Sequence, residues 1–249
     1  MKKKKNKQAK KAPLVQVLEW DTEFFGEKMA RLSPPIVDIA SMKRALNLCK
    51  KEGVACLFWR ANGSHHENLT IAHHYGFTTN GTRVLYELEA GAENYEATGQ
   101  VREMTEDDLR TLLRYAALLS NESRFHRDPR FGPKVARKTY RQWLKNMLKD
   151  AAPNTKIFVV TVGNEQAGFI ACSVQDTAAH IELIYVDKKF RGRSLGKVLL
   201  AHALRYYKKS GFPRSWVVTQ GSNIPAQRLY QSLGFRIKKM EIDYHKWFN

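Results

Sequence analysis

The sequence is poor in cysteine and has no long apolar run. Cys49, Cys56 and Cys172 are its three cysteines, and no two of them form a C-x-x-C pair. An odd, widely spaced set argues against a disulfide framework and against a thiolate zinc site. No stretch approaches the roughly 20 apolar residues of a membrane-spanning helix, and the amino-terminal segment lacks the apolar core of a signal peptide. We therefore expect a soluble, cytoplasmic protein without a membrane span.

Acidic residues are also scarce. The 24 Asp and Glu residues oppose 42 Lys and Arg residues, which gives a formal charge of +18. Seven lysines lie between Lys2 and Lys11, and +18 less these seven leaves +11 for the remainder. Because like charges repel, we expect residues 1–13 to form a disordered, solvated tail. The basic remainder attracts polyanions, which leaves nucleic acid, an anionic membrane and phosphate-bearing ligands open.

The apolar pattern predicts two α/β domains. Hydrophobic residues make up 43% of the chain, enough for a substantial core. We place a smaller lobe at residues 14–90 and a larger domain at 101–249, joined by a linker at 90–94. In the first, Met42, Leu46 and Cys49 have helical spacing, and an apolar strand follows. Residues 54–88 and 215–245 share one order of elements: a strand, a loop with Asn, Gly and Ser, a helix that ends in Gly-Phe, and a second strand. This shared order suggests that the two lobes are related.

Helix caps and turn residues organise the larger domain. Thr105 with Asp108 predicts a capping box for a helix that reaches about Leu119. The Asn, Pro and Gly residues of 120–133 predict a loop. The remaining pattern predicts a helix at 134–148, a hairpin of 157–162 with 167–174, and a strand at 180–186.

The most informative segment is a strand followed by a glycine-containing basic turn and a helix. Arg191-Gly192-Arg193-Ser194-Leu195-Gly196-Lys197 opens that helix. The first amides of a helix have no partner within it, and its dipole is positive at this end, so the turn favours an anion. Arg191, Arg193 and Lys197 add full charges. The pattern is neither a Walker A loop nor the G-x-G-x-x-G of dinucleotide folds.

This turn resembles the pyrophosphate loop of GNAT acetyltransferases, [Q/R]-x-x-G-x-[G/A], with Arg191 first and Gly196 last. Ser194 stands where a middle glycine is usual, so the backbone there must tolerate a side chain, or the hydroxyl contacts phosphate. The segment from Asn223 to Phe235 resembles the N-x-x-A-x-x-L-Y-x-x-x-G-F signature of the same superfamily. The two motifs occur in the expected order, and the resemblance covers residues 101–249.

The resemblance implies a fold, a cosubstrate and a set of contacts. The fold would be an α/β (α+β) GNAT fold, with a mixed, largely antiparallel central sheet flanked by helices and a smaller GNAT-like lobe before it. Strand 181–186 would splay from strand 215–219, and acetyl-CoA would bind there without a metal. The implied cofactor contacts are Ile184, Tyr185, Val186, Arg191, Gly192, Arg193, Ser194, Leu195, Gly196, Lys197, Asn223 and Tyr230.

Acetyl transfer to an amine needs few side chains. The resemblance gives Tyr230 the role of general acid, because the matching tyrosine lies beside the thioester sulfur; a packing role is the alternative. Glu182 is a candidate general base or a structural carboxylate, with His180 as a weaker candidate. Asn223 is placed to cap the helix that it precedes. Residues 65–66 and 73–74 are two pairs of histidines. No cysteine or acidic pattern completes a metal site with them, so we expect these histidines to be surface residues.

Shorter motifs concern the acceptor. Residues 20–26, 123–131 and 219–223 resemble two-lobed TDP-fucosamine acetyltransferases and related sugar-nucleotide N-acetyltransferases. This implies a nucleotide-linked amino sugar, with Arg124 or Arg127 near its phosphates and Phe125 against a ring; loop packing is the alternative.

Two other functions stay open. One is acetylation of a protein N-terminus or lysine, which requires an open groove. The other is a non-enzymatic RNA-binding protein that uses the lysine tail, which leaves the two ordered motifs unexplained. A small-molecule amine is therefore the expected partner and nucleic acid a disfavoured one. The sequence leaves the oligomeric state open, a homodimer included.

Overall fold

The computed structural model describes residues 13–89, 100–149, 155–175 and 177–248. Contacts divide the chain into two units, Met1–Thr79 with Ile242–Asn249, and Asn80–Glu241. The predicted tail, apart from Pro13, and the predicted linker at 90–94 lie outside the described residues.

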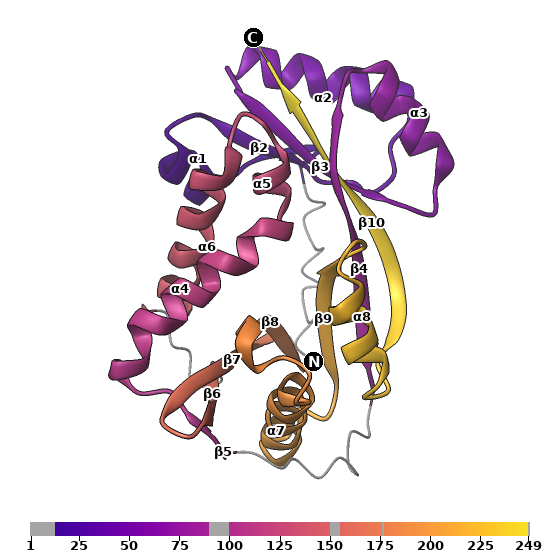
Figure 1. Ribbon diagram of the computed structural model, residues 1–249. Coiled ribbons are helices and arrows are strands. Elements are labelled where there is room, and N and C mark those ends of the chain that lie inside the picture. Colours follow the sequence, from indigo (N-terminus) through magenta and orange to yellow (C-terminus); the bar gives the residue numbers. More distant parts are fainter. Residues whose placement is uncertain (1–12, 90–99, 150–154, 176, 249) are drawn as a thin grey trace, which may run out of the picture. The chain divides into compact units, whose positions relative to one another are not determined.

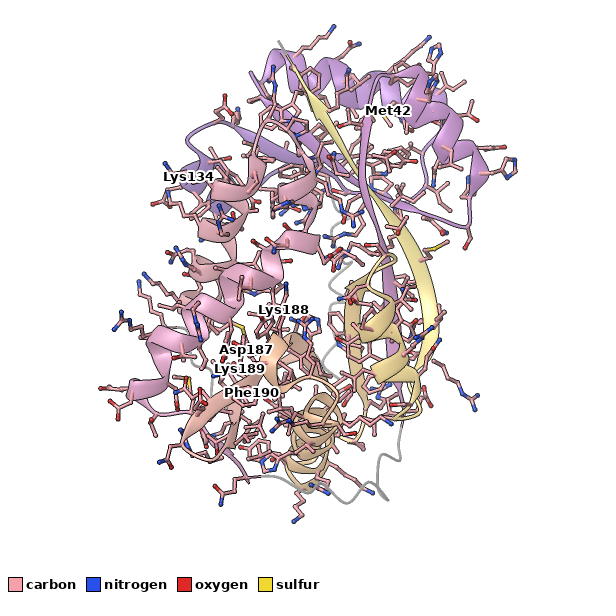
Figure 2. The ribbon with its side chains drawn as sticks, in the orientation of Figure 1. Met42, Lys134, Asp187, Lys188, Lys189 and Phe190 are labelled. Atoms are coloured by element: carbon pink, nitrogen blue, oxygen red, sulfur yellow. The ribbon has the colours of Figure 1, made fainter. Side chains whose placement is uncertain are left out.

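The first unit packs helices on a small mixed sheet. Its strands follow the order β1-β2-β3-β10, of which β1 (Val15–Val17) and β2 (Met29–Leu32) are antiparallel, and β2 and β3 (Cys56–Asn62) are parallel. Its helices are α1 (Glu19–Phe25), α2 (Ile39–Lys51) and α3 (His66–His74). The face of α2 that the sequence predicts to be apolar, with Met42, Leu46 and Cys49, is buried; Met42 is labelled in Figure 2.

The second unit contains the strand order β10-β4-β9-β8-β7-β6-β5. In the described residues, β4 is antiparallel to β9, and neighbouring strands from β5 to β8 are antiparallel to each other. The pair of β8 and β9 is parallel. The strands are β4 (Thr78–Leu88), β5 (Gln100–Glu103), β6 (Lys156–Val162), β7 (Glu165–Gln175), β8 (Ala178–Val186), β9 (Ser215–Gln220) and β10 (Arg236–Trp247). The α-helices are α4 (Leu109–Leu119), α5 (Arg124–Arg127), α6 (Gly132–Lys149), α7 (Leu195–Lys209) and α8 (Ile224–Gln231), with short 3₁₀ helices η1 (Glu106–Asp108), η2 (Ser120–Glu122) and η3 (Lys188–Phe190).

Helices cover both faces of this sheet (Figure 1). Side chains alternate between faces along a strand, so Ile170 and Cys172 pack with α7 while Phe169 and Ala171 pack with α4 and α6. The sheet is mixed and largely antiparallel with helices on its faces, which confirms the predicted fold class.

The predicted helix start at Thr105 is present, and the predicted loop after it is corrected. Thr105 and Asp108 form the capping box. Residues 120–133 contain η2, α5 and the beginning of α6 instead of an open loop. The reason is local: Ser123 caps α5 by accepting a hydrogen bond from the amide of His126 at 3.2 Å, and Gly132, with φ of 68°, starts α6.

The units also divide differently from the predicted domains 14–90 and 101–249. Residues 80–88 of β4 fall in the second unit, and β10 from Ile242 onward falls in the first. Ile242 and Tyr244 belong to the first unit's apolar core, whereas Glu241 pairs with Arg83 in the second. One long strand therefore serves both units, which periodicity alone does not reveal.

Among the described residues, no helix is both long enough and apolar enough to cross a bilayer.

Candidate active site

The site begins where β8 and β9 stop pairing. Their parallel register covers Ala179–Ile181 against Ser215–Val217, three residues on each strand. Both strands continue, to Val186 and to Gln220, without further pairs to each other in this fully described stretch. The backbone edges beyond Ile181 are thus available to hydrogen-bond a ligand.

A β-bulge lies at the point of separation. The register between β7 and β8 passes from Cys172 opposite Ile181 to Ala171 opposite Leu183, so Glu182 is the extra residue. A bulge bends its strand and redirects side chains. Glu182 is therefore held at the bend instead of in the regular alternation.

After β8 the chain makes the predicted basic turn. Figure 2 labels Asp187, Lys188, Lys189 and Phe190, which connect the end of β8 to the segment before α7. Phe190 is buried and anchors the turn in the α7 core. Ser194 has φ of 57°, a conformation that favours glycine, so the backbone does tolerate a side chain there.

The turn presents cations and helix amides. Arg191 donates from Nε to the carbonyl of Val186 at 3.1 Å, and the guanidinium of Arg193 lies 5.8 Å from the ring of Phe190. Both arginines are exposed. The amides of Lys197 and Val198 bond the carbonyl of Ser194, at 2.9 and 3.1 Å, so the helical ladder starts there and the preceding amides lie at the open end. The arrangement fits a diphosphate.

Tyr230 lies within the core of the second unit. It is 3% exposed, and its ring centroid lies 5.9 Å from those of Tyr86 and Phe235. Burial raises the pKa of Tyr230, and the nearby Cys172 and Tyr86 add to the effect. The phenol therefore stays protonated at neutral pH and is able to act as a proton donor.

The start of α8 is fixed by Asn223. Its side-chain oxygen accepts from the amide of Ala226 at 3.3 Å, so capping is a role that this residue performs. Gly221 has no space for a side chain, because a Cβ there would lie 2.2 Å from Oγ1 of Thr82.

Glu182 accepts three hydrogen bonds. Its Oε1 receives Oγ of Ser173 at 2.6 Å and Nε2 of Gln175 at 3.0 Å, and it lies 2.8 Å from Nδ1 of His180. Burial opposes the ionisation of this carboxyl, but His180, Ser173 and Gln175 together hold the pKa of Glu182 below its ordinary value.

His180 is itself fixed by a stacked ring. Its imidazole lies 3.5 Å from the ring centroid of Trp216, with 12° between the planes. Ser173, Gln175 and Trp216 are neighbours of these two candidate residues that the sequence analysis did not identify. Only the strand register, which places Ser173 opposite His180 and His180 opposite Trp216, brings them together.

The predicted acceptor residues occupy α5. Arg127 donates to Oγ of Ser222 at 2.6 Å and pairs with Glu122 at 3.3 Å, which connects α5 to the loop before α8. Phe125 packs edge-on against Phe131 at 5.3 Å, and Arg124 lies over Phe125 at 4.4 Å. The structure thus joins Arg127 to the β9–α8 loop, whereas Arg124 and Phe125 contact one another.

The histidines at 65, 66, 73 and 74 belong to the first unit, at the two ends of α3. His65 and His66 stack on each other with centroids 6.3 Å apart. Within the described ranges, no group of three or more His, Cys, Asp or Glu side chains is arranged to hold a metal ion.

Comparison with known proteins finds similarity to one family of enzymes. Residues 117–235 match the acetyltransferase (GNAT) family. This segment, slightly less than half of the chain, is thus similar to GNAT acetyltransferases. A crystal structure of a GCN5-related N-acetyltransferase from Sphaerobacter thermophilus has the same fold, with a TM-score of 0.66 and 14% identity over 94% of this chain and 76% of that one.

Three curated relatives differ in what their names say about their activity. An uncharacterised N-acetyltransferase of Methanocaldococcus jannaschii is 28% identical over 59% of this chain and 65% of its own length. The spore coat polysaccharide biosynthesis protein SpsD of Bacillus subtilis is 25% identical over 51% of this chain and 43% of its own. The ribosomal protein bS18 alanine N-acetyltransferase of Escherichia coli strain K12 is 31% identical over 35% and 60%. The chain thus spans less than two thirds of the length of these relatives.

Proposed function

We propose that this protein is an N-acetyltransferase that transfers the acetyl group of acetyl-CoA to a primary amine. The observation that carries the proposal is the end of pairing between β8 and β9 directly before a basic turn and the N-terminus of α7. A ligand with a diphosphate and a hydrogen-bonding arm fits such a site, and the GNAT family match of residues 117–235 supports CoA as that ligand.

The cofactor contacts follow from this arrangement. Arg191, Arg193 and Lys197, with the backbone of Gly192, Ser194, Leu195 and Gly196, bind the diphosphate. The backbone of Ile184, Tyr185 and Val186 hydrogen-bonds the pantetheine arm, and one amide of this strand polarises the thioester carbonyl. Asn223 holds α8, from which Tyr230 projects.

The chemistry needs one acid and one base. The neutral amine attacks the thioester carbon, the bond to sulfur breaks, and Tyr230 donates its phenolic proton to the departing thiolate. The raised pKa of Tyr230 keeps that proton available. The pair of Glu182 and His180 removes the proton from the amine. The transfer is direct and uses no metal.

For the acceptor we propose a nucleotide-linked amino sugar, such as a TDP-sugar. The similarity to SpsD, which is named for polysaccharide biosynthesis, favours a sugar. Arg127, on α5 beside the β9–α8 loop, is the residue we propose near its phosphates, with Arg124 and Phe125 as neighbours. A protein amine is the second candidate, since another relative is named as an acetyltransferase of a ribosomal protein. A cytoplasmic location and a homodimer stay predictions.

Calorimetric titration with acetyl-CoA tests the cofactor. We expect stoichiometric binding, and about a 100-fold weaker Kd in the Arg191→Ala/Arg193→Ala variant, because each arginine forms charge-assisted hydrogen bonds to phosphate. Lys50→Ala/Lys51→Ala removes two cations from α2 of the first unit and serves as the matched control with unchanged affinity. Absence of binding by the unsubstituted protein would refute the proposed function.

A further inference from the structure

The hydrogen bonds around Glu182 and His180 indicate which of the two groups takes the proton from the amine. Glu182 has an 8% exposed side chain and already accepts from Ser173 and Gln175 through the oxygen that faces His180. A carboxylate so occupied, with a lowered pKa, is a weak proton acceptor. Its geometry suits the support of a charge on a neighbour better than contact with the amine.

The distance between the two residues fixes the proton on the imidazole. Nδ1 of His180 lies 2.8 Å from Oε1 of Glu182. An ionised carboxylate only accepts hydrogen bonds, so a contact of this length requires the proton to reside on Nδ1. Gln175, 3.0 Å from Nδ1, then directs its amide proton to Glu182. In the neutral ring this leaves the lone pair on Nε2.

The ring lies beside the point where β8 and β9 separate, which is where the proposed function puts the thioester. His180 is paired with Trp216, one register position before β8 and β9 cease to pair. The stack on Trp216 sets the plane of the imidazole, and the bulge at Glu182 sets the carboxylate beside it. Among the described residues, the imidazole has hydrogen-bond or ring contacts with Gln175 of β7, Glu182 of β8 and Trp216 of β9, of which Glu182 is the ionisable group.

We propose that His180 is the catalytic base through Nε2, and that Glu182 is a positioning residue that holds the Nδ1–H tautomer and stabilises the imidazolium. This inference rests on the proposed function. As the amine nitrogen forms its bond to the acetyl carbon, its proton passes to Nε2 and the thiolate takes a proton from Tyr230. The imidazolium then returns its proton through solvent to the tyrosinate, so the enzyme regains its starting state.

Nuclear magnetic resonance of the ring nitrogens tests the tautomer without any acceptor. Long-range ¹H–¹⁵N spectra of the full chain, with the His180 signals identified by their loss in His180→Gln, should show a protonated Nδ1 and an unprotonated Nε2 at a pH where the ring is neutral. In Glu182→Gln the preference for this tautomer should weaken. A proton on Nε2 of the neutral ring in the unsubstituted protein would overturn the proposal.

Kinetics with acetyl-CoA and a TDP-linked amino sugar as probe test the roles. His180→Ala and His180→Gln should each lower kcat about 100-fold with little change in the KM for acetyl-CoA. Glu182→Gln should lower kcat about tenfold and move the acid limb of the rate profile to lower pH, because the carboxylate no longer supports the imidazolium. His66→Gln, on α3, is the control. Normal kcat and an unmoved acid limb in both His180 variants would overturn the proposal; absent turnover with intact acetyl-CoA binding would instead count against the proposed acceptor and leave the tautomer measurement decisive.

Discussion

Both units connect two parallel strands through a helix, but the two strand pairs differ in how far they stay paired. In the first unit, β2 pairs with β3 along its whole length, Met29–Leu32 against Cys56–Trp59. In the second, β8 and β9 pair over three residues and then stop. The order strand, helix, strand therefore does not by itself create space between the strands.

The turns before the helices differ in charge as well as in register. The turn before α2 contains Pro34 and Pro35 and ends at Asp38, whose carboxylate accepts from the amide of Ser41 at 2.6 Å. A fixed negative charge thus occupies the helix start that an anion would need. The turn before α7 offers Arg191 and Arg193 at the same place. Two features, an early end of pairing and cations without a carboxylate cap, distinguish the unit for which we propose the cofactor site from the other unit.

The helix that follows the second strand extends this comparison and gives the largest expected effect. Counting back from the Gly-Phe that ends each helix, Tyr230 of α8 corresponds to Ala72 of α3. We expect Tyr230→Phe to lower kcat about 100-fold, because general acid catalysis is lost. Tyr75→Phe removes a phenol from the first unit and should not change kcat. Steady-state rates measure both, and an unaffected Tyr230→Phe enzyme would make Tyr230 a packing residue.

The next largest effect is expected at Asp108, the buried residue of the capping box in the second unit. The side chain of Asp108 is 1% exposed and accepts from Arg102 at 2.6 and 2.9 Å and from the amide of Thr105 at 2.7 Å. Asp108→Asn should lower the free energy of unfolding by about 2 kcal/mol, since charged hydrogen bonds are lost in a buried place. Asp38→Asn, at the exposed cap of α2, should cost clearly less. Urea denaturation distinguishes the two, and equal losses would contradict the comparison.

The same carboxylate predicts a pH dependence. Hydrogen bonds from Arg102 hold the pKa of Asp108 below its ordinary value, although burial opposes this. A group with a depressed folded-state pKa contributes stability above its unfolded pKa, about 4, and loses it as pH falls through the folded pKa. Unfolding free energy should therefore decline below about pH 4, and Asp108→Asn should flatten that decline. An equally steep decline in the variant would exclude Asp108 as its source.

Ser194 gives the smallest effect. Its φ of 57° is costly for a residue with a Cβ, so Ser194→Gly should raise the free energy of unfolding by up to about 1 kcal/mol. Ser194→Ala keeps the Cβ and should bring no gain. Thermal denaturation of the two variants measures the difference. A loss of acetyl-CoA affinity in both would reveal a contact of the hydroxyl with phosphate.

Local patterns predicted the elements, whereas pairing determined the site. The spacing of Met42, Leu46 and Cys49, the capping box at Thr105 and the basic turn at 191–197 each depend on near neighbours in sequence, and all three are present. The bulge at Glu182 depends on which residues of β7 lie opposite it, and so does its contact with Ser173. Such register information is absent from a single strand's pattern.

The missed helices have a similar cause. Residues 120–133 carry loop-forming Asn, Pro and Gly, but Ser123 uses its side chain as a cap and Gly132 uses a positive φ to begin α6. The same residue types serve loops and helix ends, and only their backbone angles separate the two uses. The division of β10 between the units likewise depends on the core against which each half of the strand packs, and the strand's own pattern does not show this.

That division has a consequence for biosynthesis. The sheet of the first unit includes the second half of β10, which the ribosome makes after the whole of Asn80–Glu241. The amino-terminal unit therefore cannot complete its core while it emerges. The edge of β3 stays unpaired until β10, a strand far along the chain, has been made. A strand made after the second unit thus completes a core that was begun before it.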